Sequence, residues 1–152
     1  MMFSNIFQRN SDINVDRFSS YKGASVKDEY DQIKEIGNIA SYEAVIYEIS
    51  KYDTNESDFE KNLELLVNEL SKGKKVIVWH SNDDGKKGYD ISKKLEKVLS
   101  QYKNCKYLNF DFLFDEINKD LYTYSTNFLN DAANIYIYKE LDKNLRVDTW
   151  NI

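Results

Sequence analysis

The chain has 152 residues, of which 41% are hydrophobic and 14% aromatic, so it has enough apolar material to fold around a core. Its 21 basic and 26 acidic residues give a formal charge of −5, which is too small for a DNA mimic and has the wrong sign for a general nucleic-acid binder. A single cysteine excludes a disulfide framework. No apolar run reaches membrane-spanning length and no signal peptide is evident, so we expect a cytoplasmic protein.

The first third of the chain predicts an irregular arm followed by helices. Residues 1–24 have no sustained period, apart from a short strand predicted at 13–18. A capping pattern precedes residues 26–36 and a glycine follows them, which predicts a helix there. Residues 39–50 fit a helical period but are also rich in β-branched residues, and we favour a helix over a strand.

The middle of the chain predicts a strand, a helix and a second strand. A helix begins at a capping box formed by Ser57 and Glu60 and ends at Gly73. A continuous apolar run at 75–79 is typical of a strand buried on both faces. A polar loop and an amphipathic helix follow this strand, and side chains then alternate over 106–114 as in a second strand. This order defines a βαβ unit, over residues 75–113, in which the two strands are parallel.

The last third is less regular. It predicts short helices at 115–121 and 125–133, a strand at 135–138, and an edge strand or a frayed end at 146–152. The expected fold class is therefore α/β: a single small three-layer domain, residues 1–152, with a short and partly parallel sheet.

The polar loop after the first strand of the βαβ unit is the first candidate binding site. Ligands of parallel sheets bind beyond the carboxyl ends of the strands, where the next helix presents unpaired backbone N–H groups. The alternative is a loop whose polar residues only turn the chain and cap the next helix. The side chains in this loop that could contact a ligand are His80, Asn82, Asp83, Asp84, Lys86 and Lys87.

The same loop lacks a complete catalytic set. Its string His-Ser-Asn-Asp-Asp-Gly resembles the first motif of certain phosphoesterases, but these enzymes need further histidine ligands and His80 is the only histidine. The loop matches neither a P-loop nor the dinucleotide-binding fingerprint. Cys105 stands at a strand entry, where we expect a buried hydrophobe and not a thiolate. We therefore assign no catalytic residue, metal or cofactor from the sequence.

Charge is divided unevenly along the chain. Residues 1–73 sum to −6, residues 74–106 to +5 and residues 107–152 to −4. The basic segment is either a patch for a phosphate or acidic partner, or a solvated lysine-rich helix face. The acidic flanks could steer a partner with a basic surface. The flank residues we select as a candidate interface are Asp53, Glu56, Asp58, Glu60, Asp115, Glu116 and Asp120.

The function expected from the sequence is binding to another protein. Lysine outnumbers arginine eighteen to three and proline is absent, which is typical of a bacterium or phage of low GC content. The chain is acidic and carries twelve tyrosines, a residue type enriched at protein interfaces. We expect an immunity-type inhibitor that neutralises a toxin or defence protein. The alternative is a small enzyme, or a nucleotide- or phosphate-binding module, that uses the loop at 80–88.

Overall fold

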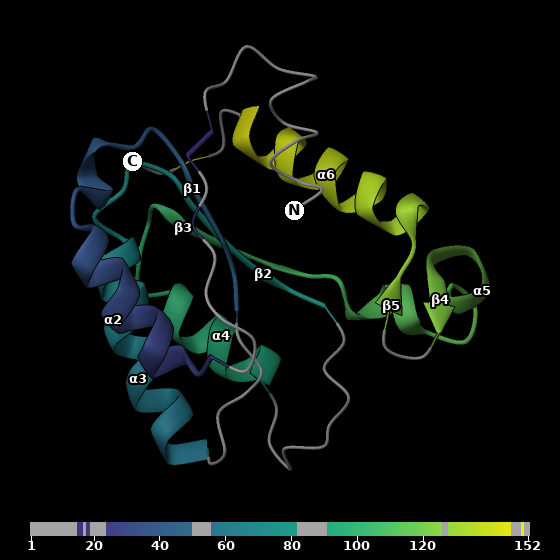
Figure 1. Ribbon diagram of the computed structural model, residues 1–152, viewed down its shortest axis with the longest axis horizontal. Helices are drawn as coiled ribbons and strands as arrows, with labels where there is room; N and C mark the ends of the chain where they lie inside the picture. The colour runs from purple at the N-terminus through teal and green to yellow at the C-terminus, as the bar shows by residue number, and fades with distance from the viewer. Residues whose placement is uncertain are drawn as a thin grey trace.

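A parallel sheet and the helices on its two faces form the framework of the computed structural model (Figure 1). The structure describes residues 15–16, 18, 24–49, 56–81, 91–125, 128–146 and 150. The elements up to the second strand are α2 (Val26–Ile36), the 3₁₀ helix η1 (Ile39–Ser41), β1 (Val45–Glu48), α3 (Glu56–Leu70) and β2 (Val76–His80). The remaining elements are α4 (Ile91–Leu99), β3 (Cys105–Asn109), the 3₁₀ helix η2 (Asp111–Phe114), α5 (Lys119–Tyr122), β4 (Thr123–Ser125), β5 (Phe128–Leu129) and α6 (Asp131–Arg146).

The three parallel strands stand in the order β1-β2-β3, which is also their order along the chain. Because both crossovers move in the same direction and such crossovers are right-handed, α3 and α4 must lie on the same face of the sheet. Figure 1 shows α2, α3 and α4 on that face and α6 across the other. The expected α/β class with a βαβ unit is confirmed, but this sheet is all-parallel and not partly parallel, because β4 and β5 pair separately as an antiparallel ribbon.

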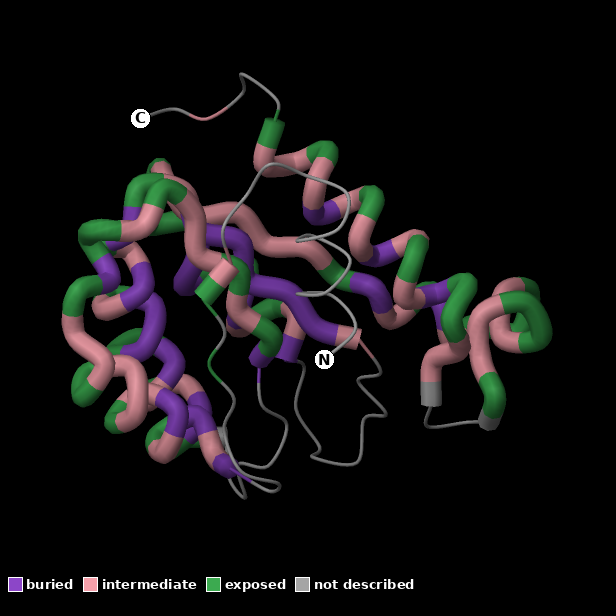
Figure 2. Tube along the Cα trace, turned by 45° about the horizontal axis from the view of Figure 1, so that its top comes forward, coloured by how far each residue is buried: buried purple, intermediate pink, exposed green. Residues whose placement is uncertain are grey.

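The central strand β2 is buried along its whole length (Figure 2). Its side chains alternate between two cores. Val76 and Val78 face the first core, and Ile77 and Trp79 face the second. The first core is filled mainly by the helices of one face, through Phe59, Leu63, Leu66, Val67, Leu70, Ile91, Leu95, Val98 and Leu99. The second is filled by the segment after β3 and by α6, through Phe110, Leu113, Ala133, Ile137 and Leu141.

The predicted first helix is confirmed in detail. Ser25 caps α2, and its hydroxyl and the Asp28 carboxylate form a reciprocal capping box. Gly37 follows the helix with a φ of 60°, a conformation that glycine adopts without strain. The capping box predicted for α3 is wrong, because this helix already begins at Glu56 and Ser57 lies inside it.

Two predicted elements change type. The helix favoured for 39–50 is wrong: these residues contain η1 and β1, because backbone pairing with β2 makes use of their β-branched residues. The strand predicted at 135–138 lies inside α6. There the buried residues Ala133, Ile137 and Leu141 recur every four positions, and packing of this stripe on the sheet outweighs local β propensity.

Other predicted boundaries shift. The strand predicted over 106–114 ends at Asn109 and continues as η2, and the helix predicted at 115–121 is reduced to α5. Of the residues predicted as a helix at 125–133, Ser125 ends β4, residues 128–129 form β5 and residues 131–133 begin α6, while 126–127 lie outside the described residues.

At the two ends of the chain, only some of the residues with predicted elements are described. Of 13–18, residues 15, 16 and 18 are described and are not in a strand. Of 146–152, Arg146 ends α6 and Trp150 places its ring 4.4 Å from the Lys106 ammonium group. The rest lie outside the described residues. No described helix is both long enough and apolar enough to cross a membrane.

Adjacent leucines of α3 provide a test of the first core. Leu66 is fully buried, whereas Leu65 is 38% exposed. Leu66→Ala should lower the free energy of unfolding by about 2–5 kcal/mol, because it removes buried methyl groups and leaves a cavity. Leu65→Ala should cost less than about 1 kcal/mol. Urea unfolding followed by circular dichroism measures both, and equal losses would show that α3 does not pack on the sheet through this face.

Candidate functional site

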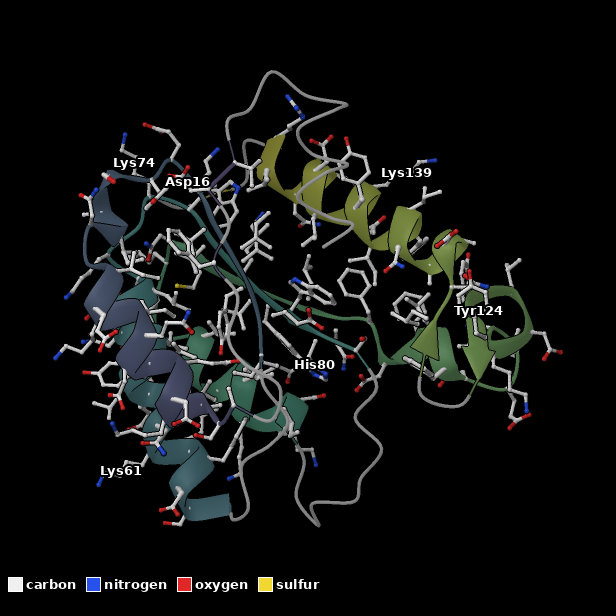
Figure 3. All side chains as sticks on the ribbon, in the orientation of Figure 1. Asp16, Lys61, Lys74, His80, Tyr124 and Lys139 are labelled. Carbon is white, nitrogen blue, oxygen red and sulfur yellow. The ribbon has the colours of Figure 1, made fainter. Side chains whose placement is uncertain are left out.

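His80, labelled in Figure 3, ends the most buried strand of the sheet and is itself fully buried. A buried imidazole is stable only when its two nitrogens find polar partners. In the parallel register, His80 lies beside Asn109 at the carboxyl edge of the sheet. The partners of His80 therefore come from β3, from the segment that follows it, and from the start of α4.

Polar side chains face both ring nitrogens of His80. The Tyr107 hydroxyl lies 2.5 Å from Nε2, and the two rings stack at a centroid distance of 5.6 Å. The Ser92 hydroxyl lies 3.4 Å from the same Nε2. On the other side, an oxygen of the Asp111 carboxylate lies 3.2 Å from Nδ1. This contact is close enough for an ionic interaction but does not meet hydrogen-bond geometry, so Nδ1 has no aligned acceptor among the described residues.

Asn109 joins the two sides of this group. Its side-chain Nδ2 donates to the Ser92 hydroxyl at 3.0 Å, and its Oδ1 accepts from the backbone N–H of Asp111 at 2.8 Å. The second bond fixes the orientation of the amide, because only its oxygen can accept from a backbone N–H. Contacts thus run from His80 through Ser92 and Asn109 to the backbone of Asp111, whose carboxylate lies next to His80 again. We call these four residues and Tyr107 the carboxyl-edge network: His80, Ser92, Tyr107, Asn109 and Asp111.

The sequence identified His80 alone among these residues. Asn82, Asp83, Asp84, Lys86 and Lys87, the other candidates of the loop, lie outside the described residues. The remaining members of the network were missed because they are far from His80 in sequence. The parallel pairing implied by the βαβ unit was the available signal, since it places the ends of β2 and β3 side by side.

Two further features of the carboxyl edge limit its chemistry. The described strands run in sequence order, so they provide no topological switch point, the place where open parallel sheets usually form a ligand crevice. Within the described part of the chain, no three His, Cys, Asp or Glu side chains are grouped so that they could hold a metal ion.

Cys105 is the first residue of β3, so it lies at the amino ends of the strands, whereas His80 lies at their carboxyl ends. Burial raises the pKa of its thiol to about 11, so the thiol stays protonated near neutral pH and is a poor nucleophile.

Of the acidic candidates from the first flank, Glu60 is engaged within the protein. Its carboxylate binds the ammonium groups of Lys94 at 2.9 Å and Lys97 at 3.0 Å, which links α3 to α4. These two lysines lower the pKa of Glu60 to about 2. Asp58 is exposed on the first turns of α3, the side chain of Glu56 is not described, and Asp53 lies outside the described residues. The first flank therefore presents fewer available carboxylates than its sequence implies.

The acidic candidates from the second flank lie together in the β3–α6 excursion, which we define as residues 110–125 and 128–130. This segment extends beyond the sheet at one end of the molecule (Figures 1 and 2). Asp115, Glu116 and Asp120 are all exposed in it. Over 110–130 the sequence holds four carboxylates and one lysine, Lys119, which pairs with Glu116 at 2.6 Å.

Large apolar side chains are exposed in the same excursion. Eight large hydrophobic residues are exposed in the described part of the chain, and four of them belong to this segment. They are Phe112 at 38%, Ile117 at 92%, Leu121 at 60% and Tyr124 at 72%, the last labelled in Figure 3. Isolated exposed apolar residues are ordinary, but several in one short segment mark a candidate interaction surface.

Internal contacts hold the excursion in place. Leu113 is fully buried, and Tyr136 of α6 packs its ring against Phe112 and Tyr122 at centroid distances of 5.7 and 5.8 Å. The side chain of Asn130 donates to the carbonyl of Leu121 and accepts from a backbone N–H at the start of α6. The exposed apolar side chains are thus presented from an anchored backbone.

The fold and these two features define the protein as an α/β domain with a buried polar network at the carboxyl edge of its sheet and an acidic, apolar excursion beside it. No family model, curated protein or solved structure matches the chain. The chemistry of both features therefore has to be inferred from the geometry of this chain.

The link between α3 and α4 makes a pH-dependent prediction. Because the pKa of Glu60 falls from 4.5 to about 2 on folding, its contribution to stability is complete above pH 4.5 and is lost as the pH falls toward 2. The difference in unfolding free energy between the wild type and Glu60→Gln should shrink over that range. Denaturant melts at several pH values measure it, with Glu64→Gln on the same helix as control. A difference that does not vary with pH would exclude the ionic link.

Proposed function

We propose that this protein acts by binding another protein and that the β3–α6 excursion is its contact surface. The observation that carries the proposal is the presence of Ile117, Leu121 and Tyr124, the three most exposed of its large apolar side chains, in one anchored segment. Buried aromatic and aliphatic anchors supply most of the binding energy at protein interfaces. Water contact with these side chains is unfavourable until a partner covers them.

The charge of the excursion supports a partner with a basic surface. The exposed Asp115 and Asp120 alternate along the chain with Ile117 and Leu121, and the only lysine of the segment is already paired with Glu116. Acidic groups around an apolar centre attract a cationic partner and speed association more than they strengthen the final complex. The matching partner surface is an apolar pocket surrounded by lysine and arginine.

The anchored backbone also favours binding. Ordering a flexible loop on association costs free energy, and a segment that is already held avoids much of that cost. The aromatic packing against Tyr136 and the hydrogen bonds of Asn130 hold the excursion before any partner arrives.

The biological role we propose is neutralisation of a toxin or defence protein of a bacterium or phage. A basic functional surface, such as the substrate-binding surface of a nuclease, has the chemistry that the excursion complements. Covering that surface would prevent its substrate from binding, so this protein would inhibit by occlusion and would need no catalytic group.

Substitutions in the excursion test the contact surface. A partner is identified by capture, purified and titrated with this protein by calorimetry. Leu121→Asp should raise the Kd about 30-fold or more, because it places a charge in the apolar centre. Asp115→Lys combined with Asp120→Lys should slow association and reduce its dependence on salt.

Matched substitutions on α3 serve as controls. Leu65→Asp and Glu64→Lys change an exposed leucine and an exposed carboxylate far along the chain from the excursion, and both should leave the Kd unchanged. The assignment of the surface is wrong if these controls weaken binding while the excursion variants do not. The inhibitory role is wrong if a saturating amount of this protein leaves the activity of the bound partner intact.

A further inference from the structure

We propose that the carboxyl-edge network is a reactive site in which Ser92 is a nucleophile toward carboxylic esters and His80 is its base. The residues come from three separate elements: His80 from β2, Ser92 from α4 and Asp111 from η2. A hydroxyl, an imidazole and a carboxylate in this order are the arrangement that activates serine for acyl transfer. This activity does not depend on the proposed binding function: only Asp111 of the set belongs to the β3–α6 excursion, and Asp111 is not one of the four exposed apolar anchors.

The polar groups around the ring indicate where the protons lie. The Asp111 carboxylate next to Nδ1 favours the tautomer of His80 that carries its proton there, which leaves the lone pair of Nε2 as an acceptor. Asn109 donates to the Ser92 oxygen, so the Ser92 hydroxyl keeps its own proton to donate. Nε2, at 3.4 Å, is in position to receive that proton once the two groups move slightly closer.

Burial and rigidity also fit such a site. His80 is fully buried, and the Asp111 carboxylate lies 3.2 Å from its Nδ1. The Asn109 side chain bonds both the Ser92 hydroxyl and the backbone N–H of Asp111, which holds these two residues near each other. Asp111 and Asn109 therefore act as positioning residues. Ser92 is partly exposed, so an ester can reach its hydroxyl from solvent while the base stays shielded.

The first turn of α4 adds a donor beside the nucleophile. Ser92 is the second residue of this nine-residue helix, so its backbone N–H has no acceptor within the helix. Such an N–H can stabilise the negative oxygen that develops when a hydroxyl attacks a carbonyl carbon.

The chemical steps balance with water as the second reactant. The Ser92 oxygen bonds to the ester carbonyl carbon while its proton passes to Nε2 of His80. The bond from that carbon to the alcohol oxygen then breaks, and the departing alcohol takes the proton from Nε2. Water next attacks the acyl carbon, gives a proton to Nε2 and releases the acid. The proton returns from Nε2 to the Ser92 oxygen, so the enzyme is restored.

Tyr107 restrains this reaction. Its hydroxyl is nearer to Nε2 than the Ser92 hydroxyl is, at 2.5 Å against 3.4 Å, and a neutral imidazole nitrogen has one lone pair. While Tyr107 donates to Nε2, Ser92 cannot. Removing the Tyr107 hydroxyl should therefore release the base to Ser92 and increase the reactivity of Ser92.

A fluorophosphonate probe tests the site on the whole protein. The probe forms a bond from phosphorus to a reactive serine oxygen and releases fluoride, and peptide mass spectrometry locates and times the modification. Ser92 should be modified at least about 100-fold faster than Ser100, an exposed serine just after the same helix whose hydroxyl donates to a backbone carbonyl. Equal rates at the two serines would overturn the proposal.

Variants separate a reactive site from a structural network. Tyr107→Phe should speed modification of Ser92, whereas Asp111→Asn should slow it by about 10-fold or more and Asp111→Glu should restore part of the rate. Circular dichroism melts confirm that each variant is folded. Hydrolysis of p-nitrophenyl acetate should follow the same order and be lost in Ser92→Ala. If folded Asp111→Asn and Tyr107→Phe both react at the wild-type rate, His80 is not the base and the proposal is wrong.

Discussion

The complete burial of β2 is the constraint on which the rest of the structure depends. All five of its residues are buried, and its apolar side chains alternate between the two cores. A strand of this kind needs a neighbour on each edge to satisfy its backbone and a layer of helices on each face to exclude water. The neighbours are β1 and β3, one face is covered by α3 and α4, and the other is covered by α6.

The carboxyl-edge network follows from the residue that ends this strand. His80 is placed in the interior by the strand that precedes it, so its polar nitrogens have to be satisfied there. The parallel neighbour β3 brings Asn109 level with His80 and Tyr107 level with Val78, from where the Tyr107 hydroxyl reaches Nε2. The turn after β3 brings Asp111. A set of polar groups assembled around a buried imidazole in this way is also preorganised, which is the property that both a structural network and a reactive site require.

The β3–α6 excursion follows from the same topology. Right-handed crossovers put both α3 and α4 on one face, so the other face is left to elements outside the two crossovers, and α6 after β3 covers it (Figure 1). The chain between β3 and α6 leaves the sheet and turns back, and it packs Leu113 and Phe110 into the second core as it does so. The residues not used in that packing, including Ile117 and Leu121, remain at the surface. The need to cover the second face thus also creates a surface that can bind a partner.

The sequence by itself determined the elements whose local signals and burial agree. These are α2 with its capping box, the apolar strand β2, and the βαβ unit that sets the α/β class. Only the tertiary structure decided that residues 45–48 form a strand and that 135–138 belong to a helix, because pairing with β2 and packing on the sheet outweigh weak local preferences. The same holds for the candidate site. The sequence identified His80, but Ser92, Tyr107, Asn109 and Asp111 become its neighbours only when parallel strands place distant residues at one edge.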